Sequence, residues 1–304
     1  NNQSFTYDVA KALTANVFVK TGYTFAGWAT SADGEVVHGN SAEVSNLTTD
    51  VNGRVDLYAK WTANDVTLTI TVGAQATGYT VTVNGTPVNY TSKNGNVYTY
   101  GIKYDNVVSI SANTATGYVI DEATTSSVFT IAGDKSVSYA FTIQGNVALV
   151  IATKADTNAI IYDINTPSAA SGSVSPTVVE NGTATYNTDF VVTNAELQLT
   201  GWNFLGWAIS ATATAAEYEA GATIASSVIN AWYTKDGSTT LYAVWAQNKY
   251  NLTFVANTPA TTNGTVTLIV NGSNITETQY VVTNAVTFDA LVEIIALAEL
   301  GGWT

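Results

Sequence analysis

The chain carries one aromatic and glycine signature twice. Residues 22–29 read GYTFAGWA and residues 201–208 read GWNFLGWA, and a second aromatic block follows each, LYAKW at 57–61 and LYAVW at 241–245. A signature that returns in the same order indicates tandem copies of one module rather than one large domain. A chain of 304 residues has room for about two to four such modules, each with a core of its own.

A third, partial copy begins near Tyr250. Thr-Pro, Gly and Val stand at the same spacing in residues 166–174 and 258–266, and the string VVTNA occurs at 191–195 and again at 281–285. The sequence therefore predicts one complete repeat in the middle of the chain and part of another after it.

The signature G-[YW]-x-F-x-G-W followed by L-Y-A-x-W resembles the Listeria–Bacteroides repeat, also called the internalin-type B repeat. The resemblance covers residues 1–62 and about 158–246 well and residues 250–304 in part. It implies a small β-grasp-like module, a sheet packed on one short helix, that occurs in tandem in secreted and wall-associated bacterial proteins. The functions it implies are those of a stalk, a spacer or an adhesion module.

The aromatic residues of the signature are expected to form the repeat cores. Alternate residues of a strand face the same side, so Tyr23 lies beside Phe25, and Trp202 beside Phe204. Large buried aromatics supply much of the stability of a small module. The alternative is an aromatic platform for a sugar. The predicted core residues are Tyr23, Phe25, Trp28, Trp61, Trp202, Phe204, Trp207 and Trp245.

Residues 66–142 lack the signature and read as short alternating strands separated by turns such as Asn84-Gly85. Asn-Gly between alternating runs favours a hairpin, and regularly spaced strands favour an immunoglobulin-like β-sandwich. The expected fold is thus mostly β, a tandem multi-module rod of α+β β-grasp-like repeats plus a sandwich. Its predicted modules are a repeat lacking its first strand (1–62, repeat 1), a β-sandwich (63–143), a complete repeat (144–246, repeat 2) and a partial third repeat (247–304).

The two ends of the sequence are expected to complement each other. Repeat 1 lacks the opening strand of repeat 2, and the third repeat stops before its closing strands. Residues 285–300 predict a packing helix with an apolar stripe, a candidate assembly interface. Either the chain is a window of a longer tandem array, or the C-terminal segment of one copy completes repeat 1 of the next. The residues of the stripe are Phe288, Leu291, Val292 and Ile295.

Composition argues against several classes of function. A net charge of −13 and a pI of about 4.2 do not fit a nucleic-acid-binding protein or attachment to an anionic membrane. No apolar run approaches the roughly 20 residues of a membrane span. With no cysteine and a lone histidine, His38, the sequence offers neither a catalytic triad nor a zinc site. We therefore expect a chain that is no enzyme and needs no metal or cofactor.

The sequence accordingly predicts a non-catalytic extracellular structural repeat protein of a bacterial surface. It could form a filament whose subunits join head to tail, with copies of itself or neighbouring modules as partners. The alternative is a stalk or adhesin segment that binds a glycan or a host protein. Trp232 and Tyr233 lie off the repeat pattern and are the candidate ligand patch for that alternative.

Overall fold

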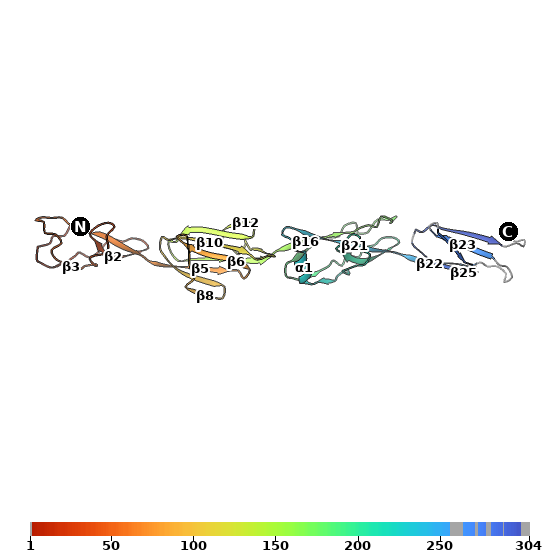
Figure 1. The fold of residues 1–304 in the computed structure, drawn as a ribbon, viewed down its shortest axis with the longest axis horizontal. Helices are drawn as coiled ribbons and strands as arrows, with labels where there is room; N and C mark the ends of the chain where they lie inside the picture. The colour runs from red at the N-terminus through yellow and green to blue at the C-terminus, as the bar shows by residue number, and fades with distance from the viewer. Residues whose placement is uncertain (1, 256–263, 271–272, 278–280, 288, 299–304) are drawn as a thin grey trace. The chain divides into compact units, whose positions relative to one another are not determined.

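The computed structural model describes all residues except 1, 256–263, 271–272, 278–280, 288 and 299–304. It falls into two compact units, Asn1–Lys154 and Ala155–Thr304. Strands of several sheets dominate both units, and one short helix, α1, is present among the described residues (Figure 1). The predicted mostly-β, multi-sheet fold is confirmed.

The middle of the first unit consists of two facing sheets. One has the order β12-β13-β10-β6-β7 and the other β14-β5-β9-β8, while β11 and β15 form a separate pair. The strands are β5 (Asp65–Val72), β6 (Ala76–Val83), β7 (Thr86–Pro87), β8 (Ser92–Asn94), β9 (Val97–Lys103), β10 (Val107–Thr114), β11 (Tyr118–Ile120), β12 (Thr130–Ala132), β13 (Ser136–Thr142), β14 (Val147–Ile151) and β15 (Thr153–Ala155).

Alternation along β5 fixes which side of this sandwich is buried. Val66, Leu68, Ile70 and Val72 point inward, and the residues between them are more exposed. The inward side chains join a single apolar cluster with residues of both sheets, and removing this area from water stabilises the sandwich. The Asn84-Gly85 pair that joins β6 to β7 has positive φ at both residues, the geometry of a tight hairpin turn.

The sandwich extends beyond its predicted end at residue 143. Strand β14 lies in the range assigned to repeat 2, yet it pairs in parallel with β5, from Val147 opposite Leu68 to Ile151 opposite Val72. It belongs to the sandwich because Leu149 and Ile151 point into the sandwich core. In the structure, repeat 2 therefore spans residues 155–247.

Repeat 2 contains a four-stranded sheet with the order β17-β16-β21-β19. The two central strands, β16 and β21, run parallel, and each has an antiparallel strand on its outer side. Helix α1 buries Ile229 in the same core as this sheet. The elements are β16 (Thr157–Asp163), β17 (Gly182–Thr185), β18 (Phe190–Val191), β19 (Trp202–Ala208), β20 (Thr223–Ile224), α1 (Ser226–Trp232) and β21 (Ser238–Gln247), with β18 paired to β20.

Among the described residues, repeat 1 has the counterparts of β19 and β21 but none of the other two strands of that sheet. Its strands β2 (Tyr23–Ala29) and β4 (Tyr58–Ala63) pair with each other, and β1 (Lys11–Ala12) pairs with β3 (Glu43–Val44). The pairing of β2 with β4 shifts register between Phe25 and Gly27, and that of β19 with β21 shifts between Phe204 and Gly206. The two copies therefore share a β-bulge at the same place in the signature.

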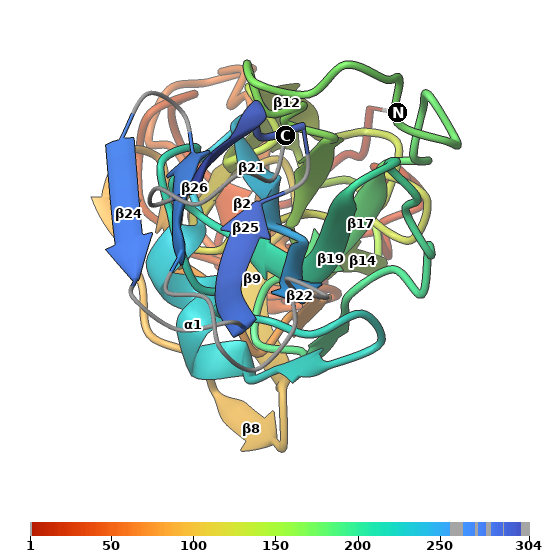
Figure 2. The ribbon, with the colours of Figure 1, turned by 90° about the vertical axis from the view of Figure 1, so that its right-hand side faces the viewer.

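The C-terminal segment forms strands where the sequence predicted a helix, so that prediction is wrong. β22 (Lys249–Val255) pairs with β25 (Val281–Thr287), and the two lie side by side in Figure 2. β23 (Gly264–Val270) pairs with β24 (Ser273–Glu277) and with β26 (Val292–Ala298). The segment is rich in β-branched residues, and a strand partner is present for each part. These two factors outweigh the helical spacing of its apolar residues.

The residues of the predicted assembly stripe do not share a helix face. Leu291 is 76% exposed in the turn before β26, Val292 is partly buried at the start of β26, and Ile295 lies farther along that strand. Phe288 lies outside the described residues. A helical stripe therefore gives no account of how copies of the chain would join.

The buried face of β5 leads to a stability prediction. Leu68 is fully buried in the sandwich core, so Leu68→Ala should lower the free energy of unfolding of the first unit by about 2–5 kcal/mol, through lost burial and a residual cavity. Thr67→Ala, on the exposed face of the same strand, should change it by less than about 0.5 kcal/mol. Urea unfolding of the two variants tests this, and equal effects would contradict the inward orientation of Leu68.

Candidate functional site

Each repeat is organised around a phenylalanine that contacts two tryptophans. In repeat 1 the ring centroid of Phe25 lies 5.0 Å from that of Trp28 and 5.6 Å from that of Trp61. In repeat 2 the corresponding centroid distances are 5.3 Å from Phe204 to Trp207 and 5.5 Å from Phe204 to Trp245. These edge-on and tilted arrangements are the favoured ones for aromatic pairs. Six of the eight predicted core residues thus form these clusters, while Tyr23 contacts Tyr104 and Trp202 packs against the core of repeat 2.

The second glycine of the signature has no side chain, so another segment of the same repeat can pass close to the backbone at the β-bulge. Gly206 has φ +128°, and a Cβ on it would lie 2.5 Å from the carbonyl oxygen of Tyr218. Gly27 has φ +146°, and its Cβ would lie 2.7 Å from the carbonyl oxygen of His38. In both repeats the next residue, a tryptophan, donates its backbone N–H to that same carbonyl oxygen. His38, the lone histidine, thus contributes its backbone to the fold.

The two repeats differ in what covers the first tryptophan of the signature. In repeat 2 the ring of Tyr162, on β16, packs edge-on against Trp207 at 4.7 Å, and Trp207 is fully buried. In repeat 1 Trp28 is only partly buried, and its ring neighbours are Phe25 and the exposed Phe18. The difference follows from the sheets, because β21 has strand partners on both edges and β4 pairs with β2 alone among the described strands.

A single residue, Asn64, joins repeat 1 to the sandwich. Its backbone N–H donates to the carbonyl of Gly22 (2.9 Å), and its backbone carbonyl accepts from the N–H of Tyr104 (2.9 Å). Its side-chain oxygen accepts from the hydroxyl of Thr24 (2.7 Å). A link of one residue, hydrogen-bonded to the module on each side, leaves the chain little freedom at this point.

Aromatic and acidic side chains close the same joint. The hydroxyl of Tyr23 donates to Asp105 (3.0 Å), and the Tyr23 and Tyr104 rings pack edge-on at 5.8 Å. The side chain of Gln144 donates to the other carboxylate oxygen of Asp105 (2.9 Å). The hydrogen bond to Asp105 raises the pKa of Tyr23, because it favours the protonated hydroxyl.

The same link recurs at the end of repeat 2. Asn248 is the single residue between β21 and β22, and its backbone N–H donates to the carbonyl of Gly201 (2.8 Å). Gly201 and Asn248 occupy the places that Gly22 and Asn64 have in repeat 1. The repeat therefore carries its own attachment geometry for the module that follows it.

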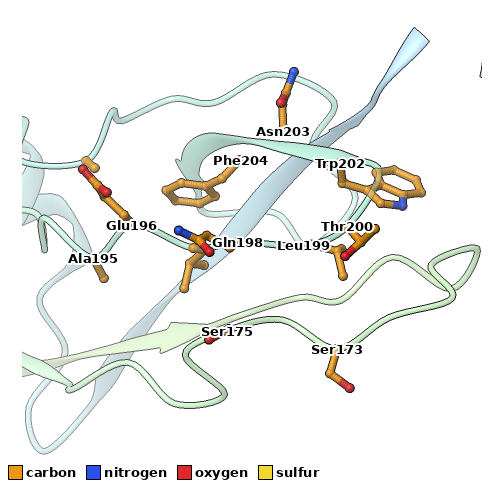
Figure 3. A pocket seen from close by; sticks show the side chains of 12 residues that line it. Ser173, Ser175, Ala195, Glu196, Gln198, Leu199, Thr200, Trp202, Asn203 and Phe204 are labelled. Atoms are coloured by element: carbon orange, nitrogen blue, oxygen red, sulfur yellow. The ribbon is translucent and has the colours of Figure 1, made fainter. Parts of the chain in front are cut away.

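An open groove of about 670 Å³ lies on repeat 2, beside the start of β19. Figure 3 shows Trp202 and Phe204 on β19 and Gln198 on the segment before it. Ser173 and Ser175 lie on a separate stretch of chain. Backbone hydrogen bonds in both directions between Ser175 and Gln198 (2.9 Å each) tie the two stretches together. The residues around the groove that carry polar side chains are Ser173, Ser175, Glu196, Gln198, Thr200 and Asn203.

Trp202, a predicted core residue, packs against the core of repeat 2 and also lines this groove, which the sequence did not predict. Trp202 is only partly buried, and no ring contact or side-chain hydrogen bond involves it in the described part of the chain. An alignment of the two signatures could have revealed the site. Where repeat 2 has the polar Glu196 and Gln198, repeat 1 has Val17 and Val19.

The candidate ligand patch of the sequence analysis is used largely within the fold. Trp232 is partly buried against the core of repeat 2, and its ring lies 5.7 Å from that of Tyr218. The hydroxyl of Tyr233 donates to Asp156, and its ring packs edge-on against Tyr186 at 5.2 Å. These contacts favour a packing role, and a ligand role for the pair stays a prediction.

Among the described residues, no cluster of three or more His, Cys, Asp or Glu side chains is placed to hold a metal ion. The helix in this part of the chain is too short to cross a membrane.

Comparisons with known proteins found little. No family model and no curated protein matches the chain. Among solved structures, the Bacillus anthracis TIE protein aligns over 79% of this chain and 49% of its own, with 9% identity and a TM-score of 0.39. The chain thus spans about half the length of that structure.

The crossing at Gly206 gives a prediction for repeat 2. Gly206→Ala should lower the free energy of unfolding of this repeat by about 3 kcal/mol or more, since it combines backbone strain with a close contact to Tyr218. Gly172→Ala is the matched control, because its Cβ would meet only ordinary contacts at 3.8 Å and beyond. Thermal unfolding measures both, and an unchanged Gly206→Ala transition would contradict this account of the signature glycine.

The Asn64 joint gives a prediction about motion. Spin labels on Asp33→Cys and Asn94→Cys, both exposed sites in a chain without cysteine, should report one narrow distance distribution by electron–electron double resonance. Inserting Gly-Gly-Ser after Asn64 should broaden it, and Tyr23→Ala should broaden it in part. A distribution in the parent as broad as that of the insertion variant would show that the joint is not stiff.

Proposed function

We propose that the chain is a non-catalytic extracellular structural repeat protein of a bacterial surface, whose copies join head to tail by strand addition. One observation carries the proposal. Strand β4 of repeat 1 has one strand partner among the described residues, and its counterpart β21 has two. An unpaired strand edge offers backbone donors and acceptors that a strand of another chain can use.

Repeat 1 also exposes apolar side chains in the segment before β2. Val17 and Val19 are 72% and 91% exposed, and Phe18 is exposed beside the partly buried Trp28. In repeat 2 the corresponding segment pairs with the chain around Ser175 through its backbone. Among the described residues, repeat 1 therefore has no counterpart of β16 or of the stretch that includes Ser175.

The third repeat contains a strand, β22, that corresponds to β16. Residues 249–255 of β22 align with residues 157–163 of β16, on the spacing of the two Thr-Pro motifs. In β16 the inward residues are Asn158, Ile160 and Tyr162. The same positions in β22 are Tyr250, Leu252 and Phe254, an apolar row suited to a core.

This correspondence specifies the contact. The register of β16 with residues 238–242 of β21 corresponds to residues 54–58 of repeat 1, the stretch that leads into β4. When β22 of a second copy runs parallel to this stretch in the same register, Phe254 takes the place of Tyr162 and covers Trp28. The donor and acceptor surfaces lie on different modules, so the contact is heterologous and can propagate as a filament. The exchange requires β22 to leave β25, its partner in this structure.

The resemblance to Listeria–Bacteroides repeats and the stiff one-residue joint at Asn64 support a structural role at the bacterial surface. The acidic, cysteine-free composition fits a secreted chain with neither nucleic acid nor membrane as a partner. The second candidate, a stalk or adhesin segment that binds a glycan or a host protein, is favoured by the groove beside Trp202.

The assembly proposal predicts concentration-dependent filaments. Negative-stain electron microscopy of the intact chain should show them, and a variant without residues 250–304 should remain monomeric. Phe254→Asp should abolish filaments because it places a charge against Trp28. Thr253→Asp, one residue away on the outward side of the strand, is the matched control and should still assemble.

Two results would contradict the proposal. One is a monomeric intact chain at all concentrations, and the other is equal assembly by the Phe254→Asp and Thr253→Asp variants. A synthetic peptide of residues 249–257 provides an independent check. It should bind the monomeric deletion variant through repeat 1, and Trp28→Ala should weaken that binding.

A further inference from the structure

The groove on repeat 2 has a chemical character that repeat 1 lacks at the same positions. Glu196 and Gln198, both exposed and both on its rim, correspond to two valines in repeat 1. The fold of the repeat therefore does not require a carboxylate and an amide at these positions. Their presence beside an aromatic side chain points to a ligand rather than to packing.

Trp202 is the aromatic element of the groove. Its counterpart in repeat 1, Tyr23, is occupied by the Tyr104 ring and by Asp105. Among the described residues, Trp202 has no ring contact and no side-chain hydrogen bond. Its indole nitrogen is also not one of the buried nitrogen and oxygen atoms that have no hydrogen-bond partner. An indole in this state offers a flat apolar face together with an accessible N–H donor.

The polar groups of the groove complement hydroxyl groups. The carboxylate of Glu196 accepts hydrogen bonds, and the amide of Gln198 both donates and accepts them. Ser173 and Ser175 line the groove from the other stretch of chain (Figure 3). A volume of about 670 Å³ is within the range of small-ligand sites and suits a few sugar rings.

Charge narrows the class of ligand. Glu196 is the one charged residue among those that line the groove, and no lysine or arginine is among them. A carboxylate on an already acidic chain disfavours anionic ligands such as sialylated or phosphorylated glycans. We infer that this groove binds a neutral oligosaccharide, with a sugar ring on the face of Trp202 and ring hydroxyls hydrogen-bonded to Glu196 and Gln198.

Saturation-transfer difference NMR on the whole chain tests the inference. The probes are maltotriose, cellotriose and tri-N-acetylchitotriose, with 3′-sialyllactose as the anionic comparison. At least one neutral trisaccharide should receive saturation and bind in a titration, and 3′-sialyllactose should not. Trp202→Ala should abolish the transfer, and Glu196→Gln should weaken binding about tenfold through the loss of a charge-assisted hydrogen bond.

Matched variants separate binding from folding. Leu205→Ala changes an exposed side chain of the same strand that does not line the groove, and it should bind like the parent. Trp202→Phe keeps an aromatic face and should retain weakened binding. Glu196 is exposed, so Glu196→Gln should leave the thermal unfolding transition unchanged and remains informative if Trp202→Ala is unstable.

Three results would overturn the inference. They are no saturation of any neutral probe, binding that Trp202→Ala and Glu196→Gln both leave unchanged, and stronger binding of 3′-sialyllactose than of the neutral probes. The inference does not depend on filament formation, because the groove lies on repeat 2 and the open edge of β4 lies on repeat 1. Loss of one activity would therefore leave the other testable in the same preparation.

Discussion

The contact of one phenylalanine with two tryptophans is the interaction on which each repeat depends. Phe204 lies on β19 and touches Trp207 on the same strand and Trp245 on β21, so one ring fixes both strands of the signature. The bulge at Gly206 is part of the same arrangement, because it turns Trp207 inward while the chain around Tyr218 crosses over it. Repeat 1 keeps the same ring contacts with only two of the four sheet strands among its described residues, which shows how much of the module this cluster determines.

The sequence predicted the parts of the structure that short-range pattern controls. The alternating residues of β5, the Asn84-Gly85 turn and the inward aromatics of the signature follow from spacing and turn chemistry. The limit of the sandwich was wrong because β14 pairs with β5, some 80 positions away, and no local pattern encodes that partner. The helix predicted in residues 285–300 was wrong for a related reason, since distant strand partners decide the conformation of a short apolar run.

The candidate site was predictable only in part. The free edge of β4 follows from comparing the copies, and so does the likeness of β22 to β16, on which the proposed strand addition rests. The groove could not be predicted in this way, because Trp202 has the same place in the signature as Tyr23. Position in the signature does not show which of the two rings another side chain covers. What separates them is the surroundings, Tyr104 and Asp105 in one case and a polar-rimmed groove in the other.

The parallel strand pairs have a mechanical consequence. In the sandwich the first strand, β5, lies beside β14, the last strand of its two sheets. In repeat 2 the first strand, β16, lies beside the last strand, β21. A pull on the two ends of either module would slide these parallel neighbours past each other. All the hydrogen bonds between them would then resist in shear together, instead of opening one after another like a zipper. Because the joint at Asn64 is a single hydrogen-bonded residue, tension would reach the sandwich without first extending a linker.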